Sequence, residues 1–523
     1  MWDFICLWPF LLLFLISLLL RWDKGGYFVK EGMRLVAWNI WITTCWTLKL
    51  PRPVLFNTPG DQESEVKLVC KPTALANYIK QHCHILIHSP VAKWPRTDPH
   101  LQILFNLMWP TEEDGGVYFK RDNLLLQDGG IIALDWAVGL KDQKGQAKKD
   151  CPPGGRVLGC HTSNPPIIIL IPNALGKITQ HLLSLCCLAL QQGFYPVVFS
   201  RRGHGSCPLT TPRYQQFGDP SDLVQAVAYL RNRHPSSVLL AVSEGSGSGL
   251  LLSYLGEYGS SSYLVAAACI SPVFHGQAWF ETPLPWLYNE AVLLYRKLQL
   301  SRYATALSSV MDVETILRSR SLQDMERLIF CSARQQDNSE MDTLDQGREQ
   351  RSRSSMKFDW VGYWDRNEPL RDADEVAVPV LCLCSSDDPL LPPSSTLPIS
   401  LFRNSPYFFL ALTTQGSHCG FMQEKHGGTG SWSHEAVLEY FRAVGDFFKV
   451  EERNFVMEGF VGQGAVQSLR QRTCTVLPRK RRAVMFRRER PVFGPQRQLS
   501  VHSGLVPFEE EHDTFTWNRS YTR

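Results

Sequence analysis

The feature that most constrains the fold is an alternation of short apolar strands with helix-like stretches after residue 166. Residues 167–171 form a continuous apolar run, Ile-Ile-Ile-Leu-Ile, of the kind that fills a parallel strand buried on both faces. Further helical and strand-like segments then alternate at residues 178–192, 195–200, 220–232, 238–242, 250–255 and 264–271. Strands that alternate with helices predict βαβ units, and so an α/β fold with a mostly parallel central sheet and helices on both faces.

The same pattern sets the domain boundaries. A hairpin is predicted at residues 123–136, because two β-rich runs flank Asp128-Gly129 and a glycine suits the tight turn. The sheet resumes at 378–384 and 407–412, and a helix at 434–450 closes it. We therefore expect one large domain over residues 120–450. The helical and polar segment at 273–375, inserted between sheet strands, is the expected lid.

Residues 5–20 form an apolar run that Arg21 ends, slightly shorter than the roughly 20 residues of a membrane span. No small-residue cleavage site follows, so residues 1–22 are predicted to be an uncleaved anchor, and a cleaved signal peptide is the alternative. Cations lie only after the run, which places the bulk of the chain in the cytosol. Residues 23–119 would then be a membrane-proximal region.

Composition excludes several classes. A net charge of +4 over 523 residues is too small to imply nucleic-acid binding. The 15 cysteines form no CxxC pair and lie in apolar segments, so we expect buried thiols rather than a metal or redox site. No cofactor is expected.

A Ser/Gly-rich turn follows the strand at 238–242, and its position suits the nucleophile of an α/β-hydrolase fold. It reads Ser243-Glu244-Gly245-Ser246-Gly247. Ser243 is the candidate nucleophile, although alanine stands where a first glycine is usual. Ser246 is the alternative nucleophile, but Glu244 and Ser248 occupy the two flanking positions where small residues are usual. Counted from the helix side, Gly245 occupies the position and no nucleophile is present.

An acid and a histidine follow in the chain order of an α/β-hydrolase. Asp387 and Asp388 come directly after the strand at 378–384, and His418 lies in a glycine-flanked loop after the next strand. Asp388 is the preferred acid because an aliphatic pair and a proline follow it, and Asp387 is the alternative. In this arrangement Asp388 would orient His418, which would take the proton from Ser243 as it attacks an acyl carbonyl.

Backbone N–H groups of Asn173 and Glu244 would stabilise the oxyanion. A carboxylate on Glu244 beside that site would oppose the developing negative charge. The irregular turn and this acidic neighbour fit a weakened or inactive enzyme as well as a working one.

These residues resemble the membrane-anchored α/β-hydrolase-domain family, also called AB hydrolase family four. The motifs that carry the resemblance are Asp128-Gly-Gly, Leu134-Asp-Trp, Arg202-Gly, Thr211-Pro-Arg-Tyr, Leu250-Leu-Leu-Ser-Tyr-Leu-Gly, Asp387-Asp-Pro and His418-Cys-Gly-Phe. The resemblance implies a single-pass anchor in the endoplasmic reticulum or a related membrane, and lipid esters as substrates of active members. It also implies a role in restraining lipolysis by supporting a membrane-bound cyclic-nucleotide phosphodiesterase.

Residues 451–523 are predicted to be a basic, largely disordered tail. The cations at 478–482 and 487–490 would suit anionic headgroups, and Ser500 lies in a basic context typical of a phosphorylation site. Two functions remain open: a serine hydrolase acting on lipid esters, and a non-catalytic membrane scaffold that uses the same fold.

Overall fold

Most of the predicted domain is described by the computed structural model. It describes residues 27–51, 64–89, 95–108, 117–140, 165–331 without 174 and 177, and 359–459 without 426 and 427. The predicted anchor at 1–22, Ser500 and the rest of the predicted tail beyond 459 lie outside these residues, so the expectations about them stay predictions. The first residues of the predicted tail, 451–459, instead continue the closing helix.

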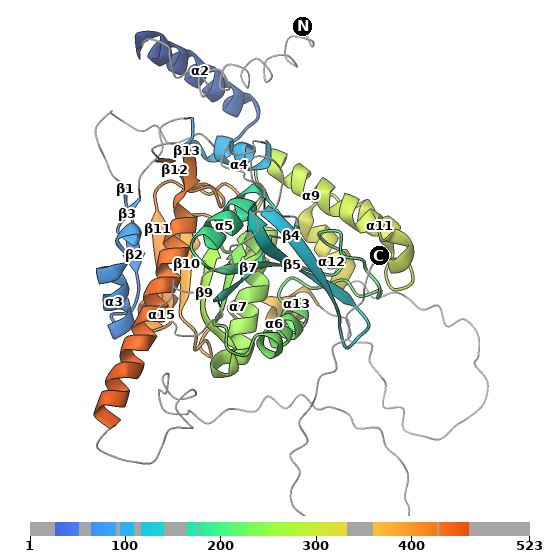
Figure 1. Ribbon diagram of the computed structural model, residues 1–523. Helices are drawn as coiled ribbons and strands as arrows, with labels where there is room; N and C mark the ends of the chain where they lie inside the picture. The colour runs from blue at the N-terminus through green and yellow to red at the C-terminus, as the bar shows by residue number, and fades with distance from the viewer. Residues whose placement is uncertain are drawn as a thin grey trace, which may run out of the picture.

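A nine-stranded sheet runs through the molecule in the order β2-β11-β10-β9-β8-β6-β7-β5-β4 (Figure 1). The six central strands, from β11 to β7, are parallel, which confirms the predicted mostly parallel sheet. Antiparallel strands close both edges, β2 on one side and the hairpin of β5 and β4 on the other. The strands are β2 (Lys67–Val69), β4 (Val117–Leu125), β5 (Ile131–Leu140), β6 (Ile167–Ile171), β7 (Tyr195–Ser200), β8 (Leu239–Glu244), β9 (Leu264–Ile270), β10 (Val380–Ser385) and β11 (Phe408–Thr413). Two small sheets pair β1 (Ser64–Glu65) with β3 (His88–Ser89) and β12 (Met422–Lys425) with β13 (Gly428–Ser431).

Helices cover both faces of the sheet, which explains why β6 is apolar at every position. Ile168 and Leu170 pack in one core and Ile167 and Ile169 in the other, because side chains alternate along a strand. The first core is covered by α3 (Ala74–His82), α5 (Gln180–Gln191) and α15 (Trp432–Gly459), and the second by α6 (Ser221–Arg233), α7 (Ser248–Tyr258) and α14 (Ile399–Asn404). The described cysteines are free thiols and most are buried, as their apolar setting predicted.

The predicted hairpin is formed by β4 and β5. Gly129 has a φ of +80°, and the Leu126 N–H donates to the Gly130 carbonyl at 2.8 Å across the turn. Asp128 in this turn accepts from Arg202 at 2.9 Å, and Arg202 also pairs with Asp222 of α6. The hairpin, the loop after β7 and α6 are therefore held together by one buried arginine.

Residues between β9 and β10 form helices with an apolar core of their own. They are α8 (Gly276–Glu281), α9 (Trp286–Ser301), α10 (Ala304–Leu307), α11 (Val313–Leu317), α12 (Leu322–Phe330) and α13 (Trp360–Asn367). This is the segment predicted to be a lid, and its role as a lid stays a prediction.

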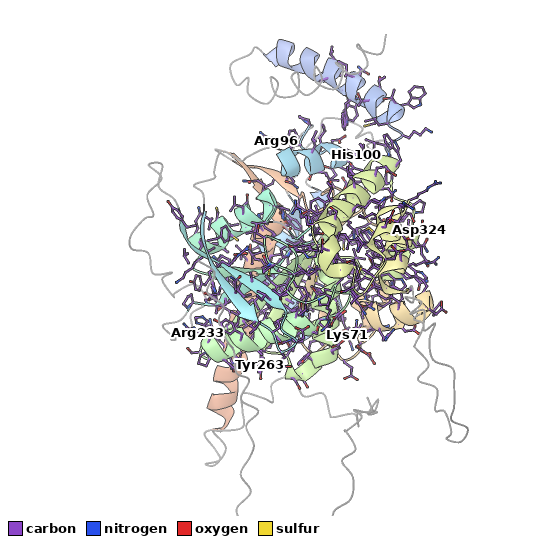
Figure 2. The ribbon with its side chains drawn as sticks, turned by 90° about the vertical axis from the view of Figure 1, so that its right-hand side faces the viewer. Lys71, Arg96, His100, Arg233, Tyr263 and Asp324 are labelled. Atoms are coloured by element: carbon purple, nitrogen blue, oxygen red, sulfur yellow. The ribbon has the colours of Figure 1, made fainter. Side chains whose placement is uncertain are left out.

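One end of the molecule carries α2 (Tyr27–Thr47) and α4 (Pro99–Met108). Figure 2 shows Arg96 and His100 at this end, opposite Arg233 and Tyr263. The Trp41 indole of α2 donates to Asp98 at 2.8 Å, which joins α2 to the start of α4. None of the helices within the described residues combines the length and the apolarity needed to cross a bilayer.

Candidate functional site

The turn after β8 lies where an α/β sheet offers its binding crevice. Strands β7 and β8 flank β6 on opposite sides, so the strand order reverses there, and ligands of open α/β sheets bind at the carboxyl ends of such strands. Strand β8 continues through Ser243 and Glu244, which pair with Cys269 and Ile270 of β9. Gly245 is the first residue beyond the strand, and it has a φ of +48°. The sharp turn is therefore made at Gly245.

Ser243 lies inside the sheet rather than on the turn. Its neighbours of like orientation, Leu239 and Ala241, pack in the core under α6 and α7. The Ser243 side chain is fully buried, and its hydroxyl has no hydrogen-bond partner within the described residues. Ser246 is buried in the 3-10 turn Gly245–Gly247 that follows. The structure thus does not bring the Ser243 hydroxyl into a hydrogen bond with His418.

His418 and Asp388 are brought together. The His418 Nδ1 lies 2.9 Å from the Asp388 Oδ2, and the Asp388 Oδ1 accepts the Leu390 N–H at 2.9 Å. The other ring nitrogen faces the turn, because a Cβ added to Gly245 would lie 2.8 Å from the His418 Nε2. The histidine therefore points at the position from which a nucleophilic side chain would start, and that position holds a glycine.

The pKa of His418 is well above its ordinary value. Burial of the ring alone would lower this pKa, but the Asp388 carboxylate and Cys419 beside the ring raise it further than burial lowers it. The Asp388 carboxylate therefore favours the protonated form of the His418 ring.

Asp387 supports the histidine loop instead of the ring. Its Oδ1 accepts the backbone N–H groups of Gly416 at 3.0 Å and Ser417 at 2.8 Å. Burial is the main cause that raises the pKa of Asp387 to about 6, with a smaller contribution from Asp388. Ser417 and Cys419, on either side of His418, both have positive φ, a conformation that costs a non-glycine residue about 1–3 kcal/mol. The loop is thus held in a strained shape by a dedicated carboxylate.

Glu244 does not face the turn, contrary to the concern that its charge would oppose an oxyanion. Side chains alternate along β8, so Glu244 leaves the opposite face from Ser243 and is 1% exposed. Its carboxylate pairs with the Nδ1 of His181 on α5. The His181 ring packs at a tilt of 51° against His434 of α15, with 4.0 Å between ring centroids. The Glu244 carboxylate therefore has its hydrogen-bond partner inside the core, away from the turn.

Asn173 lies on the loop after β6, next to the turn. Its Cβ is 3.6 Å from the position that a Cβ on Gly245 would take. The predicted oxyanion donors were the backbone N–H groups of Asn173 and Glu244, but Glu244 is still within β8. With Gly245 at the turn, the residue that follows is Ser246, so its N–H takes the place that was expected for Glu244. The oxyanion role of either group stays a prediction.

A partly buried His–Asp pair at the carboxyl edge of a mostly parallel sheet, aimed at a strand-turn-helix junction, defines an α/β-hydrolase-fold protein. The described residues hold no group of three or more His, Cys, Asp or Glu side chains that could bind a metal ion.

Comparison with known proteins identifies the family. The chain is 43% identical to human Protein ABHD15 over 477 residues, which cover 89% of this chain and 88% of that protein. It is 27% identical to human Phospholipase ABHD3 over 61% of this chain and 69% of that protein, and 23% identical to Monoacylglycerol lipase ABHD2 of Danio rerio over 72% and 85%. The chain belongs to the abhydrolase-domain family that includes Protein ABHD15.

No family model matches the chain. Among solved structures, an esterase of Pyrococcus furiosus, Pf2001, aligns with 60% of this chain and 88% of its own at 12% identity and a TM-score of 0.33. A TM-score of 0.33 is too low to support a fold assignment. The strand order and register described above define the fold instead.

Proposed function

We propose that this chain is a membrane-associated, non-catalytic abhydrolase that acts in lipid metabolism as a scaffold and restrains lipolysis through a signalling partner, a cyclic-nucleotide phosphodiesterase. The observation that carries the proposal is Gly245 at the turn opposite the His418 Nε2. A glycine there removes the atom that would attack an acyl group, while the rest of the site keeps its shape.

The hydroxyls of Ser243 and Ser248, on either side of the turn, are both placed away from the role of nucleophile. Ser243 points into the core under α6 and α7. The Ser248 hydroxyl donates to the Gly245 carbonyl at 2.7 Å and accepts the Val273 N–H at 2.9 Å, so it holds the turn closed. The raised pKa of His418 adds to this, because a general base works best when its pKa lies near the working pH.

Membrane association is supported by an exposed apolar surface at the end that carries α2 and α9. The exposed side chains are Leu35, Val36, Trp46, Trp286, Leu287, Leu294 and Leu298. Trp286 of α9 donates to the Leu48 carbonyl after α2 at 2.6 Å, so the start of α9 is joined to the end of α2. Tryptophan and leucine on such a surface suit the bilayer interface. Relatives named as a phospholipase and a monoacylglycerol lipase support a lipid setting.

The alternative function is a serine hydrolase that acts on lipid esters, acylglycerols or phospholipids, with Ser243, His418 and Asp388. The intact His418–Asp388 pair favours it. It requires Ser243 to leave its ladder position between β6 and β9 and turn toward the histidine. We rank it second for that reason.

Fluorophosphonate labelling of the full chain in membranes separates the two functions. Wild type, Ser243→Ala and His418→Ala are compared, and the scaffold predicts no labelling of any of them. Labelling of wild type that both substitutions abolish would establish the serine hydrolase. In cells that lack the protein, Ser243→Ala should restore the restraint on fatty-acid release as fully as wild type.

A further inference from the structure

Arg201, the first residue after β7, is a buried cation without a counter-ion. It is 8% exposed, and none of the described carboxylates lies within ion-pair distance of it. Its one hydrogen bond within the described residues is a long one, from a terminal nitrogen to the Pro172 carbonyl at 3.5 Å, and its Nε has none. Burial of an uncompensated charge costs several kcal/mol, so such a residue needs an explanation.

The neighbouring arginines show that the carboxylates around Arg201 are already engaged. Arg202 pairs with Asp222 and Asp128. Arg296 of α9 pairs with Glu326 at 2.6 Å, and the other oxygen of Glu326 accepts the Tyr363 hydroxyl. Each of these three acids therefore pairs with another arginine, and the guanidinium of Arg201 is left without an ion-pair partner among the described residues.

The surrounding potential is correspondingly positive. Burial lowers the pKa of Arg201 to about 10; Tyr214 and Asp222 raise it and Arg296 lowers it, so the guanidinium is still charged at neutral pH. Burial also lowers the pKa of His204 to about 4, and both Arg201 and Arg296 contribute. His204 is therefore neutral at pH 7 and adds no second charge.

Arg201 lies next to the turn that carries Gly245. The Pro172 carbonyl that it approaches is also packed against Gly247, since a Cβ on Gly247 would lie 2.5 Å from that oxygen. On its other side the same loop is held by α9, because the Tyr295 hydroxyl donates to the Leu175 carbonyl at 2.7 Å. The unpaired guanidinium is thus separated from the Gly245–His418 site by one turn of backbone.

We propose that Arg201 is the recognition residue of a buried oxyanion subsite beside the turn, which takes the carboxylate of a fatty acid or the phosphate of a phospholipid. A guanidinium offers a planar pair of N–H donors that matches either group. An anion here would satisfy the Nε and compensate the charge. The subsite needs no nucleophile, so it stands independently of whether the chain hydrolyses esters.

The test uses the full chain in nonionic detergent micelles, with binding and thermal unfolding followed for four probes. They are oleate, oleoyl lysophosphatidic acid, inorganic phosphate and oleyl alcohol. We expect oleate or the lysolipid to raise the melting temperature of wild type, and oleyl alcohol, which has the same chain without a charge, to leave it unchanged. A response to inorganic phosphate alone would identify a free anion as the ligand, and a response to the lipids alone would identify a lipid headgroup.

Arg201→Met removes the charge and keeps the length of the side chain. It should weaken binding of the anionic probe by at least about tenfold, the effect of losing a charged hydrogen bond. Without ligand it should melt no lower than wild type, because it removes an uncompensated charge. Arg213→Met is the matched control, since Arg213 is exposed and paired with Asp219, and it should bind the probes as wild type does.

Two results would overturn the proposal. One is a wild-type protein that responds equally to oleate, lysophosphatidic acid, phosphate and oleyl alcohol. The other is an Arg201→Met variant that binds the anionic probes as wild type does, or that melts lower or fails to fold, because each of these assigns Arg201 a structural role.

Discussion

Replacing Gly245 with serine should give this protein the nucleophile that its fold lacks. The new Cβ would start 2.8 Å from the His418 Nε2, closer than side chains pack, so the ring must retreat by a few tenths of an ångström. Once it has, the serine hydroxyl falls within hydrogen-bond reach of the nitrogen that would take its proton. His418, Asp388 and the turn itself are already in place.

The loss of stability and the gain in labelling rate can both be given a magnitude. A side chain at a φ of +48° with a close contact should lower the free energy of unfolding by about 1–3 kcal/mol. General-base assistance by His418 should speed fluorophosphonate labelling by about 10²–10⁴-fold over the same serine without the histidine. Because the pKa of His418 is raised, labelling should increase as the pH rises above neutrality and the ring loses its proton.

The assay compares initial labelling rates of Gly245→Ser and the double variant Gly245→Ser/His418→Ala at pH 7 and pH 9. Gly245→Ala is the matched control, because it has the same Cβ and the same backbone strain without a hydroxyl. It should lose as much stability as Gly245→Ser and show no labelling. Adding Ser243→Ala to Gly245→Ser should leave the labelling rate unchanged.

The reasoning fails if a folded Gly245→Ser variant labels no faster than Gly245→Ala. It also fails if labelling of Gly245→Ser depends on Ser243, since the reactive position would then be the residue in the strand.

Three further predictions follow from contacts around the turn. Asp387→Asn should gain stability relative to wild type as the pH rises from 4 to 7, because a raised pKa near 6 makes ionisation of Asp387 cost up to about 3 kcal/mol. Thermal melts at the two pH values check this, and a difference in melting temperature between variant and wild type that does not change with pH contradicts it. His181→Leu should lower the free energy of unfolding by about 3–5 kcal/mol, because the buried Glu244 carboxylate loses its histidine partner. Urea unfolding measures this, and the double variant His181→Leu/Glu244→Leu is the control, which should regain the lost stability. Ser248→Ala should cost about 1–3 kcal/mol, since the Val273 N–H and the Gly245 carbonyl both lose their partner, and an unchanged urea midpoint would show that water replaces the hydroxyl.

Much of the fold could be predicted from the sequence, because buried parallel strands leave apolar runs that no other element produces as well. Residues 195–200 match β7 at both ends, and 407–412 differs from β11 by one residue at each end. The edge strand β2 was not predicted, since its three residues carry no periodicity of their own. It forms because the outer edge of β11 has backbone groups with which it can form antiparallel hydrogen bonds.

The turn could not be resolved from the sequence, because Ser-Glu-Gly-Ser-Gly fits two registers. What decides between them is where β8 ends, and that depends on tertiary contacts: pairing with β9 and the Glu244–His181 pair. His181 gave no signal, since a histidine in an apolar helix reads as an ordinary core residue. Arg201 gave no signal either, because its lack of an ion-pair partner is a property of the folded neighbourhood.

The position of α2 and α4 at the end that carries the His418 loop has a consequence for any ligand. The Ser417 hydroxyl donates to the Pro99 carbonyl of α4 at 2.5 Å, so the loop and the helix cap form one surface. With a bilayer against α2, a lipid would arrive by lateral diffusion within the membrane rather than through water. Its effective concentration would then be its mole fraction in the leaflet, and occupancy of the site would follow membrane composition even when the aqueous concentration of the lipid is negligible.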